Sequence, residues 1–234
     1  MTLVDFSREQ KHPNITPRDA ATLILIDRTA RPWKVLFGRR HPHSVFMPNA
    51  LVFPGGRVDA GDRRVALADG FNPLVERKLL IGPGRITPSR ARAFGVAAIR
   101  EAYEETGLCI GRFNGASTTH HATFADAGLL PDLSRLNLVA RAITPPKVVR
   151  RFDARFFAID ADAITHRIAD VIGPDTELVE LVWLPIEEAL AGKLPPITRQ
   201  VLHDLNDRIE DGMRPDAPVP FYRFRGARFG RDWL

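Results

Sequence analysis

The sequence predicts an α/β fold in which helices cover both faces of a mixed β-sheet. Apolar runs typical of strands alternate with helical segments, but without the strict strand–helix–strand rhythm of an all-parallel sheet. Hydrophobic residues make up 44% and charged residues 26% of the 234 residues, which is ordinary for a globular protein with a sizeable core. We therefore expect a single domain over residues 1–234.

The first third of the chain carries three predicted strands. Residues 21–27 and 34–39 are short apolar runs separated by a proline-containing turn, a pattern typical of paired strands. Residues 50–53 form a third short strand, which a Pro-Gly-Gly run ends. Residues 57–86 contain repeated glycine and proline turns, so we expect only turns and short helices there.

A helix over residues 88–106 is the clearest element of the sequence. Thr87 can cap its first turn, and Pro88 fits the first helical position. Gly107 supplies the stop. One side of this helix carries small and apolar residues suited to close packing on a sheet, namely Gly95, Ala98, Ile99, Ala102 and Thr106.

The second half of the chain continues the alternation of strands and helices. Short helices are expected over residues 117–137. The Pro- and Arg-rich tail, about residues 215–234, is expected to be irregular but docked. The other predicted elements are three strands and then two helices, over residues 138–143, 151–159, 177–184, 185–191 and 197–211.

Composition excludes several classes of protein. A single cysteine, Cys109, excludes an intramolecular disulfide framework and a multi-cysteine zinc module. No apolar run approaches the roughly 18 residues that span a bilayer. The first residues lack the apolar segment of a secretory signal, so we expect a cytoplasmic protein without membrane contact. Phosphate-binding glycine loops, nucleophile elbows and zinc helices are also missing from the sequence.

The cationic side chains are nearly all arginine. The formal net charge is +5, and the 33 basic residues comprise 28 Arg and 5 Lys. The planar guanidinium binds phosphate with two parallel hydrogen bonds, so an arginine-rich surface suits phosphorylated ligands. A genome-wide preference for arginine codons explains the composition at least as well. The charge is dispersed, without a block of like charges, so we do not expect nucleic acid as a partner.

Three acidic residues near the end of the predicted helix carry the chemistry. Glu101, Glu104 and Glu105 share one helix face, where like charges repel and a divalent cation such as Mg²⁺ would compensate them. Arg100 lies four residues before Glu104 and can orient it. A solvated acidic helix end is the plain alternative. The Phe-Pro-Gly-Gly run at residues 53–56 favours a site, because glycines let backbone approach a metal or phosphate closely.

These residues resemble the Nudix box, G-x5-E-x7-R-E-U-x-E-E-x-G-U with U apolar. Residues 100–108, Arg-Glu-Ala-Tyr-Glu-Glu-Thr-Gly-Leu, fill its second half at every position. In the first half, Gly56 plus five residues leads to Asp62 instead of Glu. Residues 63–99 then separate Asp62 from Arg100, which is 37 residues where the pattern has 7, so 30 are inserted. We place the insertion at about residues 63–86.

The stretches 40–62 and 151–157 resemble the coenzyme A diphosphatase branch of the same family. The resemblance implies an α/β/α sandwich and Mg²⁺- or Mn²⁺-dependent cleavage of a diphosphate linked to another group. It also implies that Glu104 and Glu105 are the principal metal ligands and that Glu101 is a ligand or the general base. The Gly56 carbonyl would be a further ligand.

Further candidate residues lie around this box. Arg39, Arg40 and Arg57 flank the glycine turn and are candidate phosphate contacts, with ordinary surface arginines as the alternative. Glu177 and Glu180 lie on a late predicted strand where some family members supply an extra base, and solvated strand positions are the alternative. The expected partner is a small diphosphate substrate, and the family also implies a homodimer.

Three classes of function remain open from the sequence. The first is a diphosphate hydrolase acting on coenzyme A or acyl-CoA, with ADP-ribose, NAD(H) or a capped RNA end as other substrates. The second is a non-catalytic Nudix module that binds a nucleotide to regulate a partner. The presence of all three helix carboxylates favours the enzyme over this module. The third is a nucleic-acid-binding protein, which only the basic charge suggests.

Overall fold

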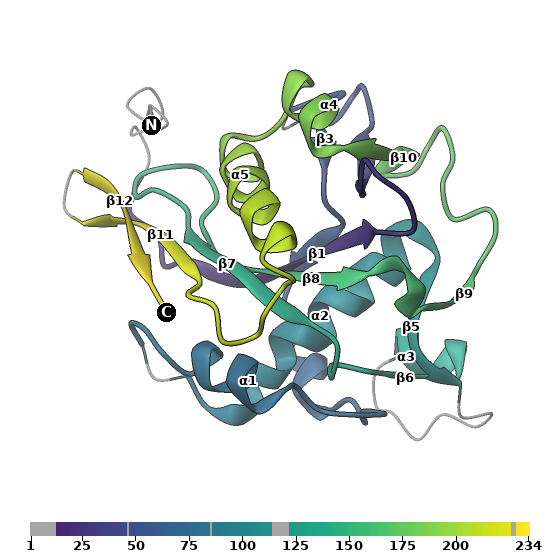
Figure 1. Cartoon of the computed structure of the whole chain (residues 1–234), viewed down its shortest axis with the longest axis horizontal. Helices are drawn as coiled ribbons and strands as arrows, with labels where there is room; N and C mark the ends of the chain where they lie inside the picture. Colours follow the sequence, from purple (N-terminus) through teal and green to yellow (C-terminus); the bar gives the residue numbers. More distant parts are fainter. Residues whose placement is uncertain (1–12, 46, 85, 114–121, 226–227) are drawn as a thin grey trace.

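A mixed β-sheet runs through the middle of the computed structural model, which describes residues 13–45, 47–84, 86–113, 122–225 and 228–234 (Figure 1). Seven strands follow one another in the order β10 (Leu178–Pro185), β2 (Lys34–Arg40), β1 (Arg18–Asp27), β8 (Phe152–Asp160), β7 (Asn137–Ile143), β11 (Pro220–Arg225) and β12 (Arg228–Trp233). Two short strands extend this sheet, because β3 (Leu51–Val52) pairs with β2, and β4 (Gly55–Arg57) pairs with β1.

The centre of the sheet is a parallel pair, β1 and β8, in register from Arg18 opposite Phe152 to Ile26 opposite Asp160. Strands buried on both faces need apolar residues at successive positions, and residues 23–26 are all fully buried. Neighbouring β2 and β7 join antiparallel on either side. The predicted mixed sheet is therefore confirmed.

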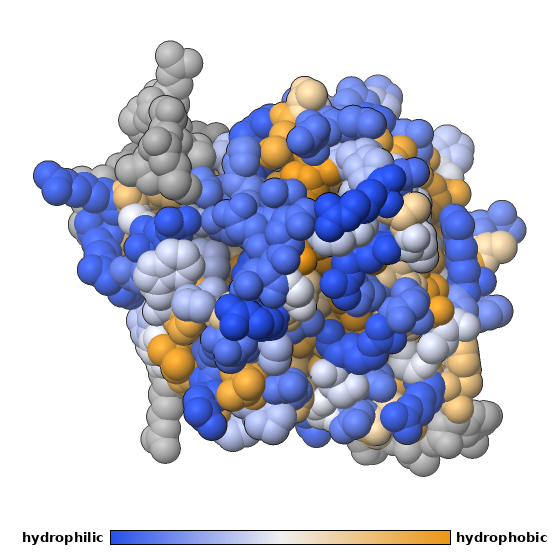
Figure 2. Space-filling view, in the orientation of Figure 1, coloured by the Kyte–Doolittle hydropathy of each residue, from blue (hydrophilic) through white to orange (hydrophobic). Residues whose placement is uncertain are grey.

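Helices cover both faces, which gives the predicted α/β/α sandwich (Figure 1). Helix α2 (Pro88–Thr106) packs on one face, where Phe94 and Ile99 join Leu23 and Leu25 of β1 in one apolar core. Helix α5 (Pro196–Glu210) covers the opposite face. Its outer side is hydrophilic in Figure 2, and its inner side buries Val201, Leu202, Leu205 and Ile209. The remaining helices are short: α1 (Pro73–Leu79), α3 (Ala122–Ala127) and α4 (Ile186–Ala191), with 3₁₀ turns η2 (Ala60–Arg64) and η3 (Ala161–Ala163).

Helix α2 begins and ends where the capping residues predict. The Thr87 hydroxyl accepts a hydrogen bond from the backbone of Arg90 at 3.2 Å. Gly107 ends the helix with φ of +73°, and its N–H donates to the Tyr103 carbonyl at 2.8 Å. A Cβ at Gly107 would also lie 2.4 Å from the Ile168 carbonyl oxygen, so only glycine fits this stop. The predicted apolar side of the helix is buried.

The segment at about 63–86 is tied into the rest of the protein. Val75 and Leu79 of α1 are buried in the core beneath α2. The Lys78 ammonium donates to backbone carbonyls of the 215–217 segment. Arg141 of β7, itself buried, donates to the Ile81 carbonyl at 3.2 Å. The segment is thus held by both side-chain packing and hydrogen bonds.

A second, smaller sheet borders the C-terminal end of α2. It has the order β6 (Leu129–Pro131), β5 (Leu108–Phe113) and β9 (Ile164–Arg167), all antiparallel neighbours. Strand β5 follows Gly107 directly, so the chain turns from the helix straight into this sheet.

Two expectations about secondary structure are wrong. The tail is not irregular, because β11 and β12 form an antiparallel hairpin and β11 pairs in parallel with β7. Its alternating aromatic and arginine residues fit a strand with two different faces. Residues 129–131 are strand β6 rather than helix, α3 covers only Ala122–Ala127, and residues 117–121 lie outside the described part. Among the helices of the described residues, none combines the length and the apolar composition of a membrane span.

Candidate active site

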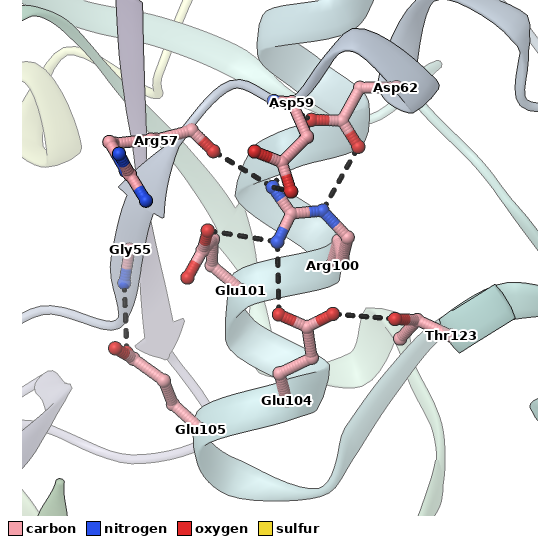
Figure 3. A network of polar contacts seen from close by, with 9 residues as sticks. All are labelled: Gly55, Arg57, Asp59, Asp62, Arg100, Glu101, Glu104, Glu105 and Thr123. Carbon is pink, nitrogen blue, oxygen red and sulfur yellow. Dashed lines mark hydrogen bonds and ion pairs between the residues drawn. The ribbon is translucent and has the colours of Figure 1, made fainter. Parts of the chain in front are cut away.

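Gly55 and Gly56, the first two residues of β4 and here called the diglycine bend, lie directly beside the acidic end of α2 (Figure 3). The Gly55 N–H donates to the Glu105 Oε2 at 3.0 Å. A Cβ added to Gly56 would lie 2.4 Å from the carboxyl carbon of Glu101, so a side chain at this position would displace that carboxylate. The two halves of the motif therefore meet in space, although residues 63–99 separate them in sequence.

Arg100 connects the parts of this site. Its side chain is only 3% exposed. Its Nη1 donates to Glu101 and to Glu104, each at 2.9 Å. Its Nη2 donates to the Arg57 carbonyl at 2.8 Å, which holds β4 against the helix. The predicted pairing of Arg100 with Glu104 is confirmed as a contact, and the guanidinium orients two carboxylates at once.

Asp62 binds the guanidinium of Arg100 at Nε and Nη2, whereas Nη1 binds the two glutamates. The carboxylate of Asp62 is completely buried, and its oxygens accept bonds from Arg100 Nε at 3.0 Å and Nη2 at 3.1 Å. It also accepts the Asp59 N–H at 2.7 Å. Burial alone would lower the pKa of Arg100, but the bonds to Asp62 and the nearby Glu101 and Glu104 raise it, so the guanidinium stays charged. At the motif position usually filled by Glu, the shorter Asp still reaches Arg100.

Glu104 is held from two directions. Arg100 binds its Oε2, and the hydroxyl of Thr123 donates to its Oε1 at 2.6 Å (Figure 3). Thr123 lies on α3, outside the box. Sequence reasoning missed this residue, because nothing in its neighbourhood indicates a contact with the box helix.

Burial penalises the charge of the other two carboxylates. It raises the pKa of Glu105 to about 8, with the hydrogen bond from Gly55 and the charge of Arg40 opposing the shift, and with Glu177 and Glu101 adding to it. Burial also raises the pKa of Glu101, against the opposing effect of Arg100. The negative charges of these two neighbouring carboxylates are disfavoured by burial, and a bound cation would stabilise them.

A cleft of about 370 Å³ opens in front of these carboxylates. One wall is the acidic face of α2, and the opposite wall is the segment that leads into β10. The lining residues are Glu101, Glu104, Glu105, Val171, Thr176, Glu177 and Leu178. A smaller cavity of about 130 Å³ lies elsewhere, where Arg28 and Asp160 pair with each other, and none of the box residues lines it.

The structure separates the predicted arginines of β2. Arg40 faces the side of the sheet that carries α2, since its partner in register, Leu178, lines the cleft. Arg39, one residue earlier, points to the opposite face and donates to Glu180 at 2.6 Å. Arg40 donates to Glu177 at 2.9 Å, and its buried Nε has no hydrogen-bond partner among the described residues. Glu177 therefore lines the cleft and Arg40 contacts it through this ion pair, whereas neither Arg39 nor Glu180 is among the lining residues.

Arg57, the third predicted phosphate contact, lies at the end of β4 with an exposed side chain. Its backbone carbonyl bonds to Arg100, as described above. The residue is therefore fixed beside the diglycine bend through its backbone, and the guanidinium reaches into solvent next to the carboxylates (Figure 3).

The donor set fits a hard divalent cation. The oxygens of Glu101, Glu104 and Glu105 face one cleft, and Gly56 leaves room beside them. Within the described ranges, however, no three acidic, histidine or cysteine side chains are gathered tightly enough to enclose an ion. Arg100 and Gly55 now occupy oxygens of these carboxylates.

Known proteins resemble this chain in sequence and in structure. The Caenorhabditis elegans protein named "Putative nudix hydrolase 7" is 30% identical over 232 residues, which cover 87% of this chain and 68% of that protein. A crystal structure of a Nudix hydrolase from Alicyclobacillus acidocaldarius matches 80% of this chain and 90% of its own, with a TM-score of 0.61 and 24% identity. No model of a protein family matches the sequence.

Proposed function

The chain belongs to the Nudix hydrolase family and is a hydrolase of diphosphate bonds, and we propose that it cleaves the diphosphate of coenzyme A or of an acyl-CoA. The single observation that supports catalysis best is that Glu105 and Glu101 lie against Gly55 and Gly56, with Glu104 beside them on the same helix face, although residues 63–99 separate the two halves of the motif. A degenerate module that only binds nucleotide has no need of all three carboxylates in this arrangement.

Mg²⁺ or Mn²⁺ is the proposed cofactor. Glu104 and Glu105, with Glu101 and the Gly56 carbonyl, would hold it. When bound, the cation neutralises phosphate oxygens and lowers the pKa of a bound water. The raised pKa values of Glu101 and Glu105 support this assignment, because a nearby cation would favour their charged forms.

The side chains of the cleft would each serve one step. Arg40, whose guanidinium donates to Glu177 at the cleft, binds an oxygen of the diphosphate. Glu101 or Glu104 takes the proton of the attacking water, whose oxygen forms a bond to one phosphorus while the bridging P–O bond breaks. Arg100 keeps both carboxylates oriented during this step. Glu177, across the cleft, is an additional candidate base.

The proposed substrate is supported by the resemblance of residues 40–62 and 151–157 to coenzyme A diphosphatases. Residues 40–62 include Arg40, which donates to Glu177 of the cleft, and Gly55, which donates to Glu105, so this resemblance covers residues that contact the cleft lining. ADP-ribose and NAD(H) share the same diphosphate chemistry. The segments that distinguish them lie outside the box, where specificity usually resides.

A substrate panel tests the proposal. Purified protein with Mg²⁺ or Mn²⁺ is incubated with coenzyme A, an acyl-CoA, ADP-ribose, NADH and a dinucleoside polyphosphate, and products are identified by mass. We expect coenzyme A to be converted to two phosphomonoesters with the highest kcat/KM. Preference for ADP-ribose or NADH would overturn the assignment of coenzyme A as the substrate. Tight nucleotide binding without turnover of any compound would overturn the catalytic function and favour a regulatory module.

A further inference from the structure

We infer that Thr123 is a positioning residue that fixes the carboxylate of Glu104 for metal binding, an inference that rests on the metal site proposed above. The Thr123 hydroxyl donates to the Glu104 Oε1 at 2.6 Å, which is a short bond to a charged acceptor. No resemblance of the sequence points to this residue. It lies on α3, in the second half of the chain after the box has ended.

The two bonds to Glu104 come from different helices and grip different oxygens. Arg100, on the same helix, binds Oε2 at 2.9 Å, and Thr123, on α3, binds Oε1. A glutamate with one anchored oxygen can still rotate about its last torsion, whereas two anchors on opposite oxygens define the plane of the carboxylate. Because Glu104 is the exposed one of the three box carboxylates, burial does not hold it, and hydrogen bonds must.

The geometry leaves Glu104 able to bind a cation. A hydroxyl donates a single proton, and each carboxylate oxygen offers two lone pairs, so Oε1 keeps one free. Partners of this kind, which bond to a ligand instead of to the ion, typically change metal affinity or activity 10- to 100-fold when removed. Thr123 thus stands to Glu104 as the Gly55 N–H stands to Glu105.

The test is Thr123→Val, which keeps the shape and removes the donor. Thr123→Ser restores the hydroxyl. Thr29→Val is a matched control, because the Thr29 hydroxyl also donates to a carboxylate at 2.6 Å, that of Asp27 at the exposed turn between β1 and β2. Each protein is titrated with Mn²⁺ without substrate, and free Mn²⁺ is counted by electron paramagnetic resonance. Melting temperature is recorded alongside.

We expect Thr123→Val to weaken Mn²⁺ binding about tenfold, while Thr123→Ser and Thr29→Val bind like the wild type. Saturating Mn²⁺ should return most of the kcat of Thr123→Val, which a general loss of folding would not allow. Unchanged or tighter Mn²⁺ binding by Thr123→Val, with normal binding by the wild type, would overturn the role of Thr123 alone. A wild-type protein that binds no Mn²⁺ would overturn the proposed metal site together with it.

Discussion

The carboxylate of Asp62 and the guanidinium of Arg100 form a two-point ion pair in the interior, with N–O distances of 3.0 and 3.1 Å, although 37 residues lie between them in the sequence. Neither side chain is exposed by more than 3%. The pair joins the diglycine half of the site to the carboxylate half. Its integrity should therefore affect both stability and catalysis.

Asp62→Asn should destabilise the protein by about 3–5 kcal/mol, because it leaves the buried Arg100 charge without its main counter-charge. Urea unfolding measures this change. Asp59→Asn is the control, since Asp59 lies 3.9 Å from Arg100 with a side chain 58% exposed, and its loss should cost less than about 1 kcal/mol. Equal unfolding midpoints for Asp62→Asn and wild type would show that the pair contributes no stability.

Gly56→Ala should reduce kcat/KM on the order of 100-fold while leaving the fold intact. The new methyl group would lie 2.4 Å from the Glu101 carboxyl carbon, and that flexible carboxylate would move aside. Gly70→Ala is the matched control, because no atom lies within 4 Å of a Cβ there. Steady-state kinetics with circular dichroism distinguishes displacement of Glu101 from unfolding. Normal kinetics for Gly56→Ala would mean that the position of Glu101 is unimportant.

The metal-free protein should lose stability as the pH rises from about 4.5 to about 8. Burial raises the folded-state pKa of Glu105 to about 8, whereas in the unfolded chain the pKa is near its ordinary value of 4.5. Between these values the unfolded state releases the proton and the folded state retains it, so rising pH favours unfolding. Above pH 8 this contribution is constant.

Melting temperatures in a chelator, measured across this range, check the effect. Glu105→Gln should flatten the decline, because the amide does not titrate. Added Mn²⁺ should also stabilise the wild type most at the alkaline end, where the proton no longer competes. A decline of the same slope in Glu105→Gln would assign it to other groups.

Arg40→Ala should raise KM about tenfold, the effect expected when a charge-assisted hydrogen bond to substrate is lost. Arg39→Ala, on the other face of the sheet, should leave KM within about twofold. The two residues are adjacent and each pairs with one glutamate, so they form a close comparison. Equal effects of the two substitutions on KM would refute the assignment of Arg40 to the cleft.

Glu104→Gln should lower kcat at least about 100-fold with little change in stability, because the exposed carboxylate serves the reaction more than the fold. Glu187→Gln, an exposed glutamate in the first turn of α4, is the control. Product formation at saturating Mg²⁺ is the measurement. Full activity in Glu104→Gln would remove this residue from the site.

Local signals in the sequence predict much of the fold. Thr87, Pro88 and Gly107 define α2 to the residue, because a cap depends on nearby backbone groups. The β11–β12 hairpin was not predicted, since the prolines and arginines of the tail are typical of an irregular segment. In the structure Arg223 and Arg225 both pair with Asp232 across the hairpin, a long-range match that composition does not reveal.

Some features of the candidate site can likewise be predicted from the sequence, and others depend on tertiary packing. Helix periodicity places Glu101, Glu104 and Glu105 on one face, and that face lines the cleft. Arg39 and Arg40 point to opposite faces because they are successive residues of one strand, which the predicted strand already implies. Which of the two lies near the cleft depends on the pairing of β2 with β10, which the residues of β2 do not reveal. The contact of Thr123 with Glu104 depends on how α3 packs beside α2.

Because Asp62 and Arg100 pair directly, the segment that connects them can be long at little energetic cost. The entropy lost on closing a loop grows only with the logarithm of its length, so an excursion of 37 residues instead of 7 costs about 1.5 kcal/mol more, and its own buried Val75 and Leu79 offset that cost. The length of this connecting segment can thus change without moving a reactive group. A search for such enzymes should therefore test whether the two halves of the motif can contact each other, and should not require a fixed number of residues between them.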